Sequence, residues 1–315
     1  MDGTREGAPV HAVATPTPLE PAPAGLGGSR TVYLKREDGH ELGAFKWRGA
    51  LPVLEAWRDD GATGVVTAST GNHGAATAWA AKRLGLRAVV YAPESASRTK
   101  IEHMRRFGAE LRLVGSDLDA AKETARAFAE EASLPFFEDG AERAQYEGYR
   151  AIGAEILDQL EEPPAAVVVP VGNGALLGGI GLEICGRASD VERIGVAAAG
   201  APVMAESYEA GDVVESSRSA TFADGLAVRV AIPLAVCVLG EVASRLLTVS
   251  EREIAEAVGA FARAGIRVEG AAAAALAALP RLDGVGDPLV LVVTGRNIDE
   301  ELFTRAVERP ESFPG

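Results

Sequence analysis

The order of hydrophobic and polar positions predicts buried strands alternating with amphipathic helices through most of the chain. Short apolar runs such as "GVVTAS", "RAVVYAP" and "ELRLVG" are each followed by a stretch with helical spacing, for example "GNHGAATAWAAKRLG". This alternation is typical of right-handed βαβ units on a parallel sheet. The run "AAVVVPVG" predicts a fully buried central strand, and a second series ends with the helix "EGAAAAALAAL" and the strand in "PLVLVVTGRNID".

The predicted fold is α/β, with two doubly wound parallel-sheet lobes and a cofactor in the cleft between them. The large cofactor-binding domain is expected to take residues 1–63 and 145–315, and a smaller, mobile, inserted domain residues 64–144. A chain of 315 residues exceeds the usual size of one domain, which fits two packed lobes. The first ~30 residues, rich in Pro, Gly and Ala, are expected to form an extended arm before the strand in "TVYLKRED".

Composition and charge narrow the function classes. Hydrophobic residues make up 47% of the chain, as in a globular protein with a full core, and the formal net charge is −14. Nucleic acid and anionic membranes are poor partners for such a chain, because both need clustered Lys and Arg. Cys185 and Cys237 are the only cysteines, so a disulfide framework is improbable. With neither a signal-peptide pattern nor an apolar run of ~18 residues, we expect a soluble cytoplasmic protein.

Four segments compete for the carboxyl ends of the strands, where open α/β sheets bind ligands. They are Lys46 in "GAFKWRGA", "STGNHG" at 69–74, "GNGALLGG" at 172–179 and "TGRN" at 294–297. Lys46 lies between Phe45 and Trp47, and two interpretations remain open. Its stem can lie on apolar surface with the amine in water, as for most lysines. Alternatively, burial favours the neutral amine, which can form a Schiff base with an aldehyde.

The glycine cluster at 172–179 also allows two interpretations. Glycines can serve tight turns and close packing, or they can present backbone N–H groups to a phosphate at a helix N-terminus. A dinucleotide site is disfavoured, because Gly178 falls at the wrong spacing and no acid ends the next strand, "VAAAG". A buried lysine, a phosphate cradle, polar small-residue loops and a terminal threonine together suit pyridoxal 5'-phosphate, which has an aldehyde, a phosphate, a pyridine nitrogen and a phenolic oxygen.

The chain resembles the fold type II pyridoxal-phosphate enzymes (the tryptophan synthase β family), on the threonine/serine dehydratase and serine racemase branch. The segments that carry the resemblance occur in family order and cover nearly the whole chain: "TPTPLE", "LKRED", "GAFKWRGA", "STGNHG", "YAPESASRTKIEHMRRFGAEL", "GNGALLGGI", "TFADGLAV", "EGAAAAALAAL" and "VVTGRNID".

The resemblance implies a role for each matching position. Lys46, flanked by Phe45, would carry the cofactor as a Schiff base and would later take the Cα proton of the substrate. Thr70 would be a second catalytic group, because it stands where racemases carry the serine that handles protons on the opposite face. The remaining cofactor contacts would be Asn72 to the phenolic oxygen, the backbone of Gly172, Asn173, Gly174, Ala175 and Leu176 to the phosphate, and Thr294 to the pyridine nitrogen.

The substrate carboxylate would bind at the start of a helix, where an anion is favoured, to Ser69, Thr70, Gly71 and His73. Arg296 stands where the family usually has glycine. It either points to solvent or reaches a second acidic group on the substrate. Glu269 is expected to cap the alanine-rich helix or to be its first-turn acid. A divalent-metal site is not expected, because the glutamate that would follow the strand "GVAAAG" is missing.

The activity that the resemblance implies is α,β-elimination on a β-substituted amino acid such as serine or threonine, giving a 2-oxo acid and ammonia. A β- or γ-replacement enzyme like threonine synthase and an amino-acid racemase remain alternatives, although His73 in "GNH" favours the dehydratase branch. A protein that keeps the fold without activity is a third possibility, against which the intact Lys46 argues. The expected partners are a small amino-acid substrate and a second copy of the chain in a homodimer.

Overall fold

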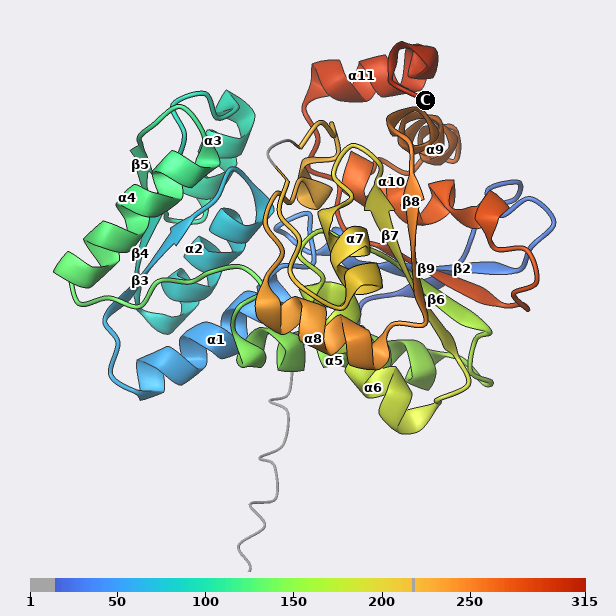
Figure 1. Ribbon diagram of the computed structural model, residues 1–315, viewed down its shortest axis with the longest axis horizontal. Coiled ribbons are helices and arrows are strands. Elements are labelled where there is room, and N and C mark those ends of the chain that lie inside the picture. Colours follow the sequence, from blue (N-terminus) through green and yellow to red (C-terminus); the bar gives the residue numbers. More distant parts are fainter. Residues whose placement is uncertain (1–14, 217–218) are drawn as a thin grey trace, which may run out of the picture.

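The computed structural model describes residues 15–216 and 219–315, and Figure 1 shows their arrangement in two lobes. Residues 1–14 of the predicted N-terminal arm lie outside the described part. The strands are β1 Leu19–Pro21, β2 Val32–Arg36, β3 Gly64–Ala68, β4 Arg87–Ala92, β5 Glu110–Leu113, β6 Ala166–Pro170, β7 Glu192–Ala198, β8 Arg245–Val249 and β9 Leu289–Val293. The α-helices are α1 Trp47–Asp59, α2 Asn72–Leu84, α3 Arg98–Arg106, α4 Leu118–Glu131, α5 Arg143–Gln159, α6 Ala175–Arg187, α7 Val203–Ala210, α8 Pro233–Val242, α9 Glu251–Arg263, α10 Gly270–Ala277 and α11 Glu300–Glu308. Short 3-10 helices cover Glu37–Gly39, Asp224–Leu226, Leu279–Arg281 and Pro310–Ser312.

The larger sheet has the strand order β1-β2-β9-β6-β7-β8 and is parallel except for β1. Its central strands β6 and β9 are buried along their whole length, because helices cover both faces. Val168 and Leu291 pack against α9 and α10 on one face, while Val167 and Val290 pack against α5, α6 and α8 on the other. The predicted α/β class is confirmed.

The smaller sheet is parallel, with the order β3-β4-β5. Val65 and Val90 face a core shared with α1 and α2, and Val66 and Val89 face α4. The segment after α4 also runs beside β3, with Phe136 paired in parallel to Val66. This pairing brings the residues that follow Phe136 to the same edge of the sheet as the residues that follow β3.

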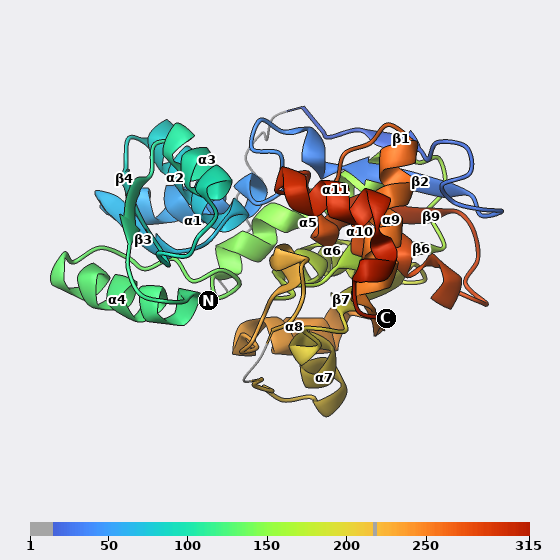
Figure 2. The same ribbon diagram turned by 90° about the horizontal axis from the view of Figure 1, so that it is seen from above.

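The two lobes lie side by side, with α5 between them in the view of Figure 2. The core of the smaller sheet includes Trp47 and Leu54 of α1, which precede residue 64. The predicted domain limits, at 63/64 and 144/145, describe which segments would move together as one body. These limits stay a prediction.

One local difference from the sequence expectation lies in the N-terminal segment. The predicted arm contains a strand, β1, which pairs antiparallel with β2 from Leu19↔Lys35 to Pro21↔Tyr33. A short antiparallel edge strand is a common addition to a parallel sheet. Its three residues, "LEP", carry no hydrophobic alternation that could have indicated a strand.

A buried ionic cluster lies under the first turn of α1. The Arg48 guanidinium, which is 1% exposed, donates to Glu37 at 2.8 Å and to Glu155 at 2.7 Å. Lys35 donates to the same Glu155 carboxylate at 2.6 Å. Charge-assisted hydrogen bonds between buried partners fix geometry strongly. Because Arg48 is two positions after Lys46, this cluster holds the start of α1 against β2 and α5. None of the helices within 15–216 and 219–315 is long and apolar enough to cross a membrane.

Candidate active site

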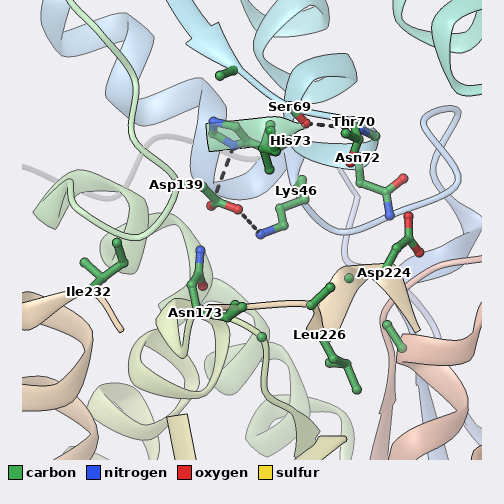
Figure 3. A pocket seen from close by; sticks show the side chains of 18 of the residues that line it. Lys46, Ser69, Thr70, Asn72, His73, Asp139, Asn173, Asp224, Leu226 and Ile232 are labelled. Atoms are coloured by element: carbon green, nitrogen blue, oxygen red, sulfur yellow. Dashed lines mark hydrogen bonds and ion pairs between the residues drawn. The ribbon is translucent and has the colours of Figure 1, made fainter. Parts of the chain in front are cut away.

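A cavity of about 490 Å³ lies between the lobes, at the carboxyl ends of both sheets. Figure 3 shows its centre, where Lys46, the loop at 69–73 and Asn173 converge. Most of the residues predicted from the sequence line this cavity: Phe45, Lys46, Ser69, Thr70, Gly71, Asn72, His73, Gly172, Asn173, Gly174, Leu176 and Thr294. Ala175 and Arg296 do not line it.

Lys46 stands immediately before α1, and a backbone hydrogen bond of its neighbour Phe45 links this position to the larger sheet. The Phe45 N–H donates to the Thr294 carbonyl at 3.1 Å, which links the start of α1 to the end of β9. The lysine side chain is 15% exposed, and its Nζ donates to Oδ2 of Asp139 at 2.6 Å. Sequence reasoning surrounded this amine with apolar neighbours. In the structure Phe45 is near it, 5.0 Å from Nζ to the ring centroid, but the direct partner is a carboxylate.

Asp139 is the functional candidate that sequence reasoning missed. It follows Phe136 and Phe137, the segment paired with β3, so the end of that segment delivers it to the cavity. Burial alone would raise the pKa of the Asp139 carboxyl, but the charge of Lys46 and the hydrogen bonds from Lys46 and Gln145 hold it well below its usual range. An acidic residue directly after an apolar run at a sheet's carboxyl edge was the signal that could have found it.

The loop from Ser69 to His73 forms the start of α2 at the cavity. The Ser69 hydroxyl oxygen accepts from the Gly71 N–H at 3.1 Å, which leaves its own proton free to donate into the cavity. His73 is buried, and its Nδ1 lies 3.6 Å from Oδ1 of Asp139. Burial lowers the pKa of His73 below its usual range, despite the opposing charge of Asp139. This helix start therefore combines unpaired backbone N–H groups with fixed polar side chains.

Asn72 belongs to a polar network that spans both lobes. Its Nδ2 donates to Glu269 Oε1 and Oε2 at 3.1 and 3.0 Å, and its Oδ1 accepts from Asn297 at 2.8 Å. Glu269 was expected to cap the alanine-rich helix. It does stand at the N-cap of α10, but its side chain makes no capping hydrogen bond and faces Asn72 and Gly295 instead. Burial, helped by the neighbouring charge of Asp224, raises the pKa of Glu269 to about 8.

The loop before α6 has the geometry of a phosphate cradle. A Cβ on Gly172 would lie 2.3 Å from the Gly225 carbonyl oxygen, and Gly174, the N-cap of α6, has φ 89°. Both positions therefore need glycine, one for close approach and one for a left-handed backbone. Asn173 accepts from the Ala175 N–H at 3.1 Å, so that N–H is already satisfied. Leu176, the next residue of the first helical turn, lines the cavity, where the helix dipole favours an anion.

Thr294 supplies an observation that tests the fit of a cofactor. Its hydroxyl is buried, 2% of the residue being exposed, and Oγ1 has no hydrogen-bond partner among the described residues. A buried hydroxyl without a partner costs free energy unless a bound group satisfies it. An orphaned hydroxyl, a glycine cradle and a lysine amine around one cavity match the pyridine nitrogen, phosphate and aldehyde of pyridoxal phosphate.

Arg296 does not line the cavity around Lys46, although it lies near two of the other predicted residues. Its side chain is exposed and lines a second cavity of about 150 Å³, together with the predicted residues Gly71 and Asn72 and with Lys100, His103 and Asp299. Its nearest hydrogen-bond acceptor is the His40 carbonyl, at 3.5 Å from Nη2. Nothing in this placement points the guanidinium toward Lys46.

Comparison with known proteins agrees with this geometry. The family model described as "Pyridoxal-phosphate dependent enzyme" matches residues 10–295. The chain belongs to this family. It uses pyridoxal 5'-phosphate, as the resemblance implied. The "L-threonine ammonia-lyase" of Geobacter sulfurreducens is 36% identical over 282 residues, which cover 88% of this chain and 70% of the relative.

Solved structures of the family share the fold over almost the whole chain. The processed form of threonine deaminase isoform 2 from Solanum lycopersicum superimposes with a TM-score of 0.89 at 30% identity, covering 95% of this chain and 89% of that one. A fungal L-serine ammonia-lyase from Rhizomucor miehei gives a TM-score of 0.84 at 25% identity, covering 94% and 98%. The two-lobed arrangement of parallel sheets is thus a property of the family.

Proposed function

We propose that this protein is an ammonia-lyase for L-threonine or L-serine, releasing 2-oxobutyrate or pyruvate and ammonia. The chain is a pyridoxal-phosphate-dependent lyase of the dehydratase type, and the choice of amino acid is the proposed part. The observation that carries the proposal is the Lys46 amine, placed in one cavity with the glycine cradle and the orphaned Thr294 hydroxyl. Over the whole reaction the amino acid loses water and then takes water up again, so the net products are one 2-oxo acid and one ammonia.

The large lobe supplies the groups for holding the cofactor. We assign the phosphate to the N-terminus of α6, with Gly172, Gly174 and Leu176 at the cavity wall. Ala175 would contribute indirectly, because its backbone N–H holds the Asn173 side chain. The Thr294 hydroxyl would pair with the pyridine nitrogen, and Asn72 would reach the phenolic oxygen. When bound, pyridoxal phosphate offers an aldehyde to a lysine and a ring that accepts electron density from Cα.

The small lobe supplies the groups for the substrate carboxylate. Ser69 can donate its hydroxyl proton, and Thr70 and Gly71 lie beside it at the start of α2, where the helix dipole favours an anion. His73 would bind less directly, because its Nε2 already faces Thr67 and the Phe137 carbonyl. Arg296, in the second cavity, would contact only a longer substrate with a second anionic group.

Proton movement would rest on Lys46 and Thr70. The Lys46 amine, once free and unprotonated, is a base that can take the Cα proton, and its position in the cavity gives it reach. Thr70 lines the same cavity and carries the hydroxyl that could handle a proton from another direction.

We further propose that residues 64–144 move as a lobe that closes over the substrate and excludes water from the reacting atoms. Polar contacts that support a closed arrangement cross the cleft: Lys100 pairs with Asp224, and Arg229 pairs with Asp119. Substrate should then protect the amides of 69–74 from hydrogen exchange, and unchanged exchange there would count against closure. The proposal also includes a cytoplasmic location and a homodimer, and light scattering would test the dimer.

The activity is tested by incubating purified enzyme with L- and D-threonine and L- and D-serine, measuring 2-oxo acid and ammonia. We expect both products in equal amounts from an L-substrate, and at least about a thousandfold less from Lys46→Ala, in line with removal of a catalytic base and nucleophile. Racemisation without 2-oxo acid release, or turnover that is unchanged in Lys46→Ala, would overturn the proposal.

A further inference from the structure

One charged group in the cavity has no place in the scheme above: the Asp139 carboxylate, whose side chain is partly buried. Its Oδ2 accepts from Lys46 Nζ at 2.6 Å and its Oδ1 from Gln145 Nε2 at 2.6 Å. Gln145 is itself fixed, because its Oε1 accepts from the Gly140 N–H at 2.7 Å and its Nε2 lies 3.1 Å from the Tyr149 hydroxyl. The carboxylate is therefore held in place from behind and faces the cavity with Lys46.

His73 is the other titratable group near this carboxylate, and its hydrogen bonds show that it is a poor substitute for the lysine. The Thr67 hydroxyl donates to the Phe137 carbonyl at 2.8 Å, so His73 Nε2 must be the donor to Thr67 Oγ1, 3.1 Å away. In the neutral ring Nδ1 then carries no proton and cannot donate to Asp139. Burial disfavours the doubly protonated ring, since it lowers the pKa of His73.

We propose that Asp139 is a positioning residue for Lys46, which binds the amine as an ion pair whenever that amine is free and protonated and thereby opposes its attachment to the cofactor. The inference rests on membership of the pyridoxal-phosphate family and not on the identity of the amino-acid substrate. Lys46 and Asp139 are each other's direct charged partner within hydrogen-bond distance in a site where an unpaired charge is costly.

The ion pair must break when the lysine is attached. On attachment the Lys46 ammonium would give one proton to solvent, its nitrogen would form a C=N bond to the aldehyde carbon, and the aldehyde oxygen would leave as water with the two remaining amine hydrogens. Each time the amine is released during turnover, Asp139 can bind it again and keep it close to Cα. Asp139 thus favours the released lysine over the attached one.

The test uses cofactor-free enzyme and compares two variants that lose the same charge at adjacent positions. Asp139→Asn keeps the shape and removes the ion pair with Lys46. Glu138→Gln is the matched control, because Glu138 pairs with Lys122 and Arg126 and has no ion pair with Lys46. Added pyridoxal phosphate is titrated at neutral pH, and attachment is followed by visible absorbance.

We expect Asp139→Asn to bind the cofactor about tenfold more tightly than the original protein, the lower end of what a charge-assisted hydrogen bond supports. Glu138→Gln should stay within about twofold of the original protein. Weaker attachment in Asp139→Asn, or equal changes in both variants, would overturn the proposal.

A double-mutant cycle in the cofactor-free protein gives a second readout that does not depend on attachment. Lys46→Met should lower the melting temperature, because it leaves the partly buried Asp139 carboxylate without its cation. Adding Asp139→Asn to Lys46→Met should recover much of that loss, whereas adding Glu138→Gln should not. Additive effects of Lys46→Met and Asp139→Asn would contradict the pairing. If Asp139→Asn alone fails to fold, the comparison of Lys46→Met with the double variant still decides.

Discussion

Two helices begin at the same cavity, and they prepare it in different ways. The start of α6 presents mainly backbone groups, because its loop, "GNGAL", contains one polar side chain. Glycines at 172 and 174 let this loop pass close to Gly225 and Leu239. The start of α2 is made of side chains: Ser69, Asn72 and His73 each bond to a neighbour. Both present a helix N-terminus to an anion.

The difference matches two kinds of anion. A phosphate that stays bound needs a rigid cradle, and backbone locked by packing provides one without titratable groups. In the proposed scheme, a substrate carboxylate that enters and leaves each cycle would be bound at the start of α2, beside titratable groups such as Glu269 behind Asn72 and Asp139 beside His73. We therefore expect substitutions that displace the backbone to weaken cofactor binding at the start of α6. Substitutions that remove a polar side chain should weaken substrate binding at the start of α2.

The largest effect is expected from Gly172→Ala. The added methyl group would lie 2.3 Å from the Gly225 carbonyl oxygen, so the cradle must shift. Overpacking of about 1–3 kcal/mol corresponds to a loss of about 5- to 150-fold in affinity for pyridoxal phosphate, measured by titration of cofactor-free protein. Gly186→Ala is the control on the same helix, because no described atom beyond its own chain neighbours lies within 4 Å of that methyl position. Equal affinities of the two variants would show that the loop is not a rigid cradle.

Ser69→Ala should have a smaller and more selective effect. Loss of one hydroxyl donor to a carboxylate is worth about 1.5–3 kcal/mol, so we expect KM for the amino acid to rise about tenfold or more. Cofactor absorbance should not change, because Ser69 belongs to the α2 side. Ser95→Ala removes the same group from an exposed loop and should leave kinetics unchanged. If Ser69→Ala lost the cofactor, Ser69 would serve cofactor binding and not substrate binding, which would contradict the assignment.

The smallest effect concerns pH and Glu269, the carboxyl behind Asn72. Because burial raises the pKa of Glu269 to about 8, the folded state favours the protonated form. Its contribution to stability is present below the ordinary pKa of about 4.3 and is lost as pH rises through about 8. When the pH is raised from 5 to 9, the melting temperature of cofactor-free Glu269→Gln should therefore fall less than that of the original protein. Each kcal/mol of difference in the free energy of unfolding should appear as a difference of about 2–4 °C. Glu256→Gln, exposed on α9, should follow the original protein, and parallel curves for all three would contradict the assignment.

The hydrophobic pattern of the sequence correctly predicted those features that depend on residues close together in the chain. The βα alternation, the buried strand β6 and the glycine loop before α6 all follow from residues within one element and its flanks. The missed features are contacts across long sequence distances. Asn72 meets Glu269 over 197 positions, and Lys46 meets Asp139 over 93.

The neighbours of Lys46 show why sequence proximity misled. Phe45 packs with Tyr149 in a core of the large lobe, at a ring distance of 5.2 Å, while Trp47 packs with Trp79 in the core of the small lobe. The two aromatic side chains adjacent in sequence thus belong to separate cores. The lysine between them reaches the space at the junction, and its partner comes from a segment that only the folded chain brings near.

The most direct test of the account is the identity of the lysine that carries the cofactor. Purified protein is reduced with borohydride, digested and analysed by mass spectrometry, which locates the added pyridoxyl phosphate group on one peptide. We predict that it lies on Lys46, and that Lys46→Ala carries none. Modification of Lys100 or Lys122, which also line these cavities, or a protein that takes up no cofactor at all, would contradict the site described here.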